Sequence, residues 1–143
     1  MGIRRGEITT KIVSDGLVFN MDPANRASYP RTGATVTDTI GDITGTLTGA
    51  NGDNNTPQWE NTNGGIFDFD GTDDAIDWGD SDNFSFGNGT TDSPFSIFAW
   101  FNADVLVSND RFIISKFTTS TQREYLLELL SDEVTMVLCD TSN

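Results

Sequence analysis

Apolar and polar residues alternate with a period of two along several short stretches of the chain, which is the pattern of β-strands with one buried face. The clearest stretch is residues 64–79, GGIFDFDGTDDAIDWG. Two phenylalanines alternate with aspartates up to Asp70-Gly71, a turn-forming pair, and Ile76 and Trp78 follow at the same spacing. This stretch predicts a hairpin of two short strands joined by GTDD, apolar on one side and rich in carboxylates on the other.

The most apolar run of the chain is FSIFAWF, residues 95–101. Apolar side chains occupy both sets of alternate positions, so a strand formed here would have no polar face. A strand that is covered on both faces lies in the middle of a sheet. We therefore expect Phe98 and Trp100 to be buried on the opposite face from Ile97 and Ala99.

Other short runs predict further strands, most of them bounded by Gly, Asn, Asp or Pro. The run YLLELL is ambiguous between helix and strand, but a helix so short would be isolated between two strands, which favours a strand. The expected strands are residues 16–22, short pieces of 35–48 separated at Gly41 and Gly45, 112–117, 125–130 and 134–139. About eight or nine short strands without a helical pattern predict an all-β fold, an antiparallel sandwich.

Charge is unevenly distributed along the 143 residues, whose net charge is −14. Residues 32–110 hold fourteen acidic residues and no Lys or Arg, whereas residues 1–31 hold five basic and three acidic ones. An acidic middle argues against a nucleic-acid partner, because phosphates would be repelled. It is compatible with divalent cations and with solubility alone.

The N-terminal segment is the basic exception. Residues 1–13 hold Arg4, Arg5 and Lys11, and we expect them to form a docking arm in front of a single domain at residues 14–143. The segment has no apolar core of the kind found in Sec-type signal peptides. No run approaches the about 20 apolar residues of a membrane span, so a membrane is not an expected partner.

Two counts restrict the possible chemistry. The chain has one cysteine, Cys139, and no histidine. An intrachain disulfide is therefore impossible, and we expect Cys139 to be a small buried hydrophobic residue. Without histidine, Ser-His-Asp and Cys-His catalysis and histidine-ligated zinc are excluded.

Four strings, in their order and spacing, resemble the laminin-G-like, concanavalin A-like jelly-roll domain. They are GLVFNMDPANRASYPRTG, TVTDTIGDITGTLTG, GGIFDFDGTDDAIDWGD and SPFSIFAWFNAD. The likeness spans roughly residues 16–140 and is strongest to the versions found in tailed-phage virion proteins. Such domains continue with further strands, so the resemblance implies a jelly-roll sandwich that is incomplete at its C-terminus. Further residues or another subunit would then complete the sheet.

The resemblance implies a structural protein located in the virion, either a capsid-decorating subunit or a fibre or appendage subunit. Its partners would be other virion proteins and further copies of itself, with Arg4, Arg5 and Lys11 docking on the particle. The alternative is a carbohydrate-binding adhesin module that attaches to host glycans. Jelly-roll modules stack an exposed aromatic ring on a sugar, and Trp59, Tyr29 and Trp78 are the candidates in or near loops, although core packing is the more common use of each.

Hydrolysis of glycans is disfavoured. Related jelly-roll glucanases use paired carboxylates on one strand, in a pattern such as Glu-x-Asp-x-x-Glu, and the five glutamates here form no such triplet. Glu124 and Glu128 would share one face of a strand at ~13 Å, too far apart for a retaining pair. We therefore expect the chain not to be an enzyme.

Calcium is the one cofactor that the resemblance implies. The string DFDGTDD fails the EF-hand pattern, because counting from Asp68 places Asp73 and Gly79 where Gly and Glu are required. In pentraxins, which are relatives of this jelly roll, an Asp-Asn pair that opens the corresponding strand binds calcium. Asp73 and Asp74 stand at the similar place. The alternative is that both carboxylates cap a tight turn through local hydrogen bonds.

Overall fold

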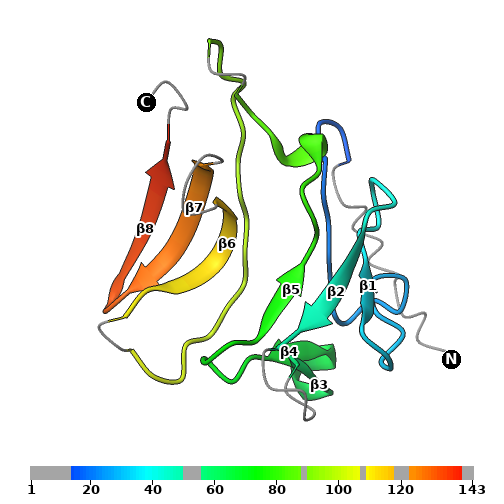
Figure 1. Cartoon of the computed structure of the whole chain (residues 1–143). Helices are drawn as coiled ribbons and strands as arrows, with labels where there is room; N and C mark the ends of the chain where they lie inside the picture. The colour runs from blue at the N-terminus through cyan, green and yellow to red at the C-terminus, as the bar shows by residue number, and fades with distance from the viewer. Residues whose placement is uncertain (1–13, 50–55, 88–89, 107–108, 118–122, 140–143) are drawn as a thin grey trace, which may run out of the picture. The chain divides into compact units, whose positions relative to one another are not determined.

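The structure, a computed structural model, describes residues 14–49, 56–87, 90–106, 109–117 and 123–139 (Figure 1). The predicted arm, with Arg4, Arg5 and Lys11, lies outside the described residues. The strands are β1 (Thr35–Thr37), β2 (Thr44–Thr48), β3 (Gln58–Glu60), β4 (Ile66–Asp68), β5 (Ala75–Asp77), β6 (Arg111–Phe117), β7 (Arg123–Leu130) and β8 (Glu133–Leu138), and two 3-10 turns, Thr62–Gly64 and Asp82–Phe84, complete the regular structure.

Every pairing between these strands is antiparallel, which confirms the predicted all-β, antiparallel class. The chain divides into two compact units. The first contains the described residues up to Phe69 together with Ala75–Asp77, and it holds the sheets β1-β2-β5 and β3-β4. The second contains Asp70–Asp74 and the described residues from Trp78 onwards, and it holds the sheet β6-β7-β8. No helix in the described ranges has the length and apolar character that a membrane span requires.

The sheet β1-β2-β5 forms the centre of the first unit. Val36 on β1 and Leu47 on β2 are buried, whereas the threonines that alternate with Leu47 are mostly exposed. The expected break at Gly41 is confirmed by the turn between β1 and β2. Gly45 does not interrupt a strand, because it lies inside β2 opposite Val36. A residue without a side chain fits there beside a fully buried valine.

The predicted hairpin at residues 64–79 is wrong, although both of its strands form. β4 pairs with β3, and β5 pairs with the outer edge of β2, so the GTDD loop connects two sheets. An alternating pattern fixes which side chains share a face, but it does not identify the neighbouring strand. Here β4 and β5 do not pair with each other, because each pairs with a strand earlier in the chain, β3 and β2 respectively. The pairing of β2 with β5 therefore encloses β3 and β4 in the sequence.

Two predicted strands are extended but form no ladder among the described residues. Residues 17–22 lack strand pairing, and Asn20 is instead joined to the turn after β1. Residues 95–101 also lack it, and the prediction that Phe98 and Trp100 are buried is wrong, because these side chains are 82% and 90% exposed. The alternation itself is present from Phe95 to Ala99, where every second residue is half-buried, and it ends at Phe101, which is exposed. No described strand lies hydrogen-bonded beside this segment.

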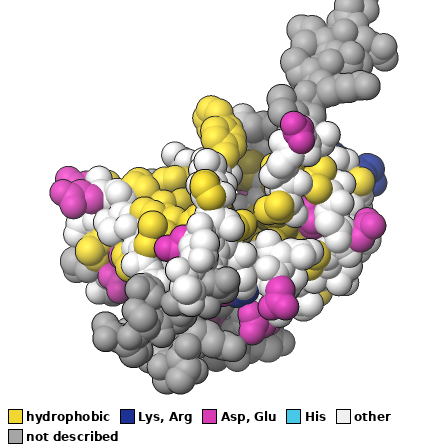
Figure 2. All heavy atoms as spheres, turned by 90° about the horizontal axis from the view of Figure 1, so that it is seen from above, with side chains coloured by type: hydrophobic (Ala, Val, Ile, Leu, Met, Phe, Trp, Pro, Cys, Tyr) yellow, Lys and Arg dark blue, Asp and Glu magenta, His cyan; other side chains and the backbone are white. Residues whose placement is uncertain are grey.

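The three strands expected near the C-terminus are confirmed as β6, β7 and β8, with β7 in the centre. The ring of Tyr125 on β7 packs against Phe86 and Phe95 at centroid distances of 5.8 and 5.3 Å. Cys139 follows β8 and is half-buried, not fully buried as expected. The outward residues of β8 are exposed and apolar: Val134, Met136 and Leu138. Figure 2 shows apolar side chains reaching the surface of the molecule.

Candidate functional site

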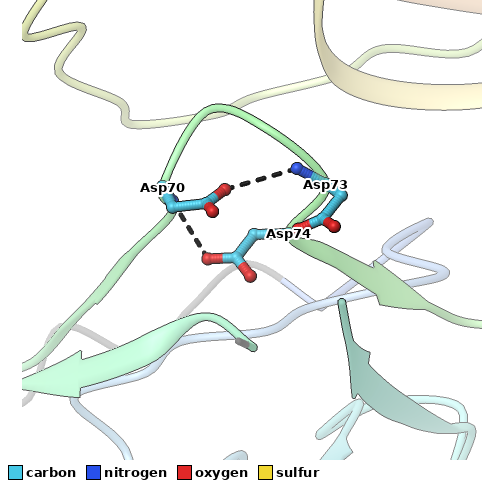
Figure 3. Close-up of side chains that lie close together, drawn as sticks. All are labelled: Asp70, Asp73 and Asp74. Carbon is cyan, nitrogen blue, oxygen red and sulfur yellow. Dashed lines mark hydrogen bonds between the residues drawn. The ribbon is translucent and has the colours of Figure 1, made fainter. Parts of the chain in front are cut away.

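The loop between β4 and β5 brings three carboxylates together (Figure 3). Asp70, Asp73 and Asp74 each offer one oxygen, and these oxygens lie within 4.8 Å of one another. The sequence predicted Asp73 and Asp74 as candidate ligands, and the structure adds Asp70. The signal for Asp70 was its place at the start of the Asp-Gly turn, where an aspartate side chain folds over the residues that follow.

Local hydrogen bonds give the loop its shape. Asp70 Oδ1 accepts hydrogen bonds from the backbone N–H groups of Thr72 at 2.7 Å and Asp73 at 3.3 Å, while Gly71 adopts a φ of 70°. Asp74 Oδ2 accepts from the backbone N–H of Asp70 at 3.0 Å. The turn-capping interpretation therefore describes Asp70 and Asp74 in this structure. Because a carboxylate has two oxygens, capping leaves acceptors for a second partner.

Backbone N–H groups favour the charged form of Asp70. The hydrogen bond from the backbone N–H of Thr72 lowers the pKa of Asp70 below its usual range, burial opposes this effect, and the N–H of Asp73 acts in the same direction as that of Thr72. Asp74 Oδ1 is buried and has no hydrogen-bond partner. Two oxygens bound to one calcium ion at about 2.3–2.6 Å lie at most about 5 Å apart, which the measured spacing satisfies. The loop can therefore offer oxygen ligands to a hard cation.

Two of the candidate sugar-binding residues, Trp59 and Tyr29, have structural partners in the first unit. Trp59 is half-buried on β3, its Nε1 donates a hydrogen bond to the carbonyl of Pro23 at 2.9 Å, and the guanidinium carbon of Arg31 lies 4.4 Å from the centre of the ring. Tyr29 is only 5% exposed, and its hydroxyl donates to the carbonyl of Gly33. A buried ring has no face for a sugar, so of these two residues a carbohydrate site would depend on Trp59. That role stays a prediction.

A polar network in the second unit was not anticipated from the sequence. The ammonium group of Lys116 lies 2.6 Å from Ser85 Oγ, 3.3 Å from Glu124 and 3.4 Å from Asp80. Ser85 Oγ also donates to Glu124 Oε1 at 2.9 Å. These residues are far apart in the sequence, so no spacing rule could have joined them. The network holds the loop before residue 86 against β6 and β7.

The glutamates considered for hydrolysis lie on β7, where Glu124 joins the Lys116 network and Glu128 is buried. The docking residues Arg4, Arg5 and Lys11 lie outside the described part of the chain. No protein-family model matches the sequence, and comparisons with curated proteins and with solved structures find no match either. The likeness to virion jelly-roll domains therefore depends on the four sequence strings, and function has to be inferred from the residues themselves.

Proposed function

We propose that this chain is a structural subunit of a tailed-phage virion, a capsid-decorating or fibre subunit that displays a jelly-roll domain. The proposal is supported by the order and spacing of the four sequence strings and by the antiparallel all-β fold of the described residues. Its position in the particle would place it beside capsid or tail proteins and beside further copies of itself.

The observation that carries the proposal is that the first three strings contact one another in the folded first unit. Asn20, in the first string, donates its backbone N–H to Asp38 of the second string at 2.7 Å. The ring of Tyr29, also in the first string, lies 4.9 Å from the ring of Phe67 in the third. β2 of the second string pairs with β5 of the third. A shared sequence pattern is expected to encode a shared fold when its residues form the contacts that hold the fold together.

Mass spectrometry of purified phage particles tests the proposal, together with the genes adjacent to the one that encodes this chain. We expect the chain at a fixed copy number relative to the capsid or tail proteins, and we expect capsid or tail genes beside its own. A chain that is synthesised during infection but is absent from washed particles would contradict the proposal.

Calcium binding by the acidic loop is a second candidate function, and the buried, unpartnered Asp74 Oδ1 is the observation that favours it. Calcium takes about six to eight oxygen ligands, of which three carboxylates supply at most about six. Asp70, Asp73 and Asp74 would hold the ion, and its charge would relieve the repulsion between three neighbouring carboxylates. A bound ion would also fix the connection between the sheets that β4 and β5 join.

A further inference from the structure

Residues 95–101 form an extended segment that no described strand pairs with, and Figure 1 draws it within the long yellow-green trace that precedes β6. Phe95 anchors one end, because its ring stacks on Phe86 at 4.4 Å and contacts Tyr125. Among the described residues, no hydrogen bond joins the backbone of 95–101 to another segment. An extended backbone with open N–H and C=O groups is a template for an added strand.

The outward face of this strand is strongly apolar. Trp100 and Phe98 are 90% and 82% exposed, and their rings pack edge to face at 6.0 Å. Two aromatic rings of this kind expose about 150–250 Å² each. Monomeric proteins rarely leave contiguous apolar patches of several hundred Å² uncovered, which indicates an interaction surface.

We propose that residues 95–101 accept a β-strand formed by residues 7–13 of a second copy of this chain. The segment EITTKIV equals the open strand in length and is rich in β-branched residues, which favour strands. Ile8, Thr10 and Ile12 alternate along it, so one face of the added strand would cover the exposed rings. Strand addition of this type supplies backbone hydrogen bonds and side-chain contacts together.

Charge complementarity selects this occupant. The open strand is flanked by Asp92, Asp104 and Asp110, and residues 32–110 contain no Lys or Arg that could balance them. The arm carries three of the eight basic residues of the chain. In an antiparallel pairing that sets residue 7 opposite residue 101, Arg4 stands opposite Asp104. Opposite charges facing across neighbouring strands stabilise the pairing and fix its register.

Reciprocal exchange of arms between two copies gives a closed dimer with two-fold symmetry. A stable interface buries about 800 Å² per partner. The two exposed rings account for about half of that area. The remainder comes from the two added strands, because each copy donates its residues 7–13 and accepts those of its partner. The inference does not rest on the virion assignment, because the purified chain contains both surfaces and no other virion protein.

Sedimentation equilibrium of the chain of residues 1–143 tests the dimer. We expect a monomer–dimer equilibrium whose dissociation constant rises at least about tenfold in Arg4→Glu and in Trp100→Lys. Two matched controls should change it by less than about twofold. Arg26→Glu reverses an exposed charge outside the arm, and Leu138→Lys adds a charge to an equally apolar position on the edge of β8.

A charge exchange tests the register. Asp104→Arg should weaken the dimer by itself, and the double variant Arg4→Glu/Asp104→Arg should restore it, which a general loss of folding would not do. Circular dichroism verifies that each variant keeps its strands. A monomer at every concentration, an unchanged dimer after deletion of residues 1–13, or a stronger effect of Leu138→Lys than of Trp100→Lys would each overturn the proposal.

Discussion

Asp38 is fully buried and accepts three backbone hydrogen bonds, from Asn20 at 2.7 Å, Ile40 at 3.0 Å and Gly41 at 2.6 Å. It thereby fixes the turn between β1 and β2 and attaches residues 17–22 to that turn. A Cβ atom at Gly41 would lie 2.8 Å from Asp38 Oδ2, so glycine leaves room for the carboxylate. This aspartate stabilises the fold from a fully buried position, whereas the carboxylates of the acidic loop are half-buried or exposed.

Replacing this carboxylate should destabilise the first unit. Asp38→Ala leaves three N–H groups without their acceptor, and we expect it to lower the free energy of unfolding by about 2–4 kcal/mol. Asp68→Ala, at an exposed position on β4, should change it by less than about 0.5 kcal/mol. Urea denaturation compares the two. Equal effects would show that Asp38 contributes no more than a surface residue.

Asp70→Asn separates the two interpretations of the acidic loop, because asparagine keeps the turn-forming oxygen and removes the charge. If the loop binds calcium, millimolar calcium raises the midpoint of thermal unfolding of the native chain, since a ligand that binds only the folded state stabilises it. We expect a much smaller rise in Asp70→Asn and in Asp73→Asn/Asp74→Asn, with little change in the absence of calcium.

Asp68→Asn serves as the charge-matched control for that titration, because Asp68 lies outside the cluster of three carboxylates. The same rise in all variants, or no rise in the native chain, would leave turn capping as the better account of the loop.

At the scale of elements, β7 organises the second unit, and Tyr125 is its buried aromatic. Burial raises the pKa of the Tyr125 hydroxyl above its ordinary value of 10.0, and the charge of Glu124 acts in the same direction. The folded state therefore disfavours the tyrosinate. The contribution of the protonated Tyr125 hydroxyl to the free energy of unfolding is fully present below pH 10 and is lost as the pH rises through the raised pKa.

Tyr125→Phe should remove this alkaline loss of stability while keeping the ring contacts with Phe86 and Phe95. Urea denaturation between neutral and strongly alkaline pH measures the free energy of unfolding of both chains, and tyrosinate absorbance is an independent readout. Tyr125 in the folded chain should ionise at a higher pH than a tyrosine in the unfolded chain. An alkaline decline of the same size in Tyr125→Phe would assign the decline to other groups.

Local patterns predicted most strands and few of their partners. β6, β7 and β8 follow one another with short connections, so adjacent strands pair and the prediction is confirmed. β4 and β5 look equally adjacent in the sequence, yet each pairs with an earlier strand. Residues 95–101 alternate as predicted, but burial of Trp100 required a neighbour that alternation does not specify.

Candidate sites followed the same division. Asp73 and Asp74 were identified because the carboxylates of the acidic loop lie close together in the sequence. Asp70 joins them because its side chain accepts a hydrogen bond from the backbone N–H of Thr72, two residues further on. Ser85 and Lys116 lie 31 positions apart and meet only because β6 folds beside the segment that follows the 3-10 turn Asp82–Phe84. A cluster formed by neighbouring residues of one loop could be predicted from the sequence. A cluster formed by residues of distant segments could not.

For the whole molecule, the contrast between a basic arm and an acidic body gives an assembly prediction. Deleting residues 1–13 should abolish incorporation into particles and leave the fold intact, because every strand of the described sheets lies after residue 34. Complementation of a deletion phage, followed by quantitative mass spectrometry of particles, measures the occupancy. Full occupancy by the shortened chain would show that the arm does not dock on the particle.

The enclosure of β3 and β4 between β2 and β5 has a consequence for the order of folding. Thr48 and Ala75 are partners separated by 27 positions, and closing so long a loop costs more conformational entropy than closing a short one. Once β3 and β4 have paired, the effective loop is shorter. A ribosome-bound chain should therefore protect the amides of β3 and β4 from hydrogen exchange before those amides of β2 that face β5, because this edge of β2 stays open until Asp77 has left the exit tunnel. Pulse labelling of stalled chains of increasing length would contradict this order if the β2 amides that face β5 became protected first.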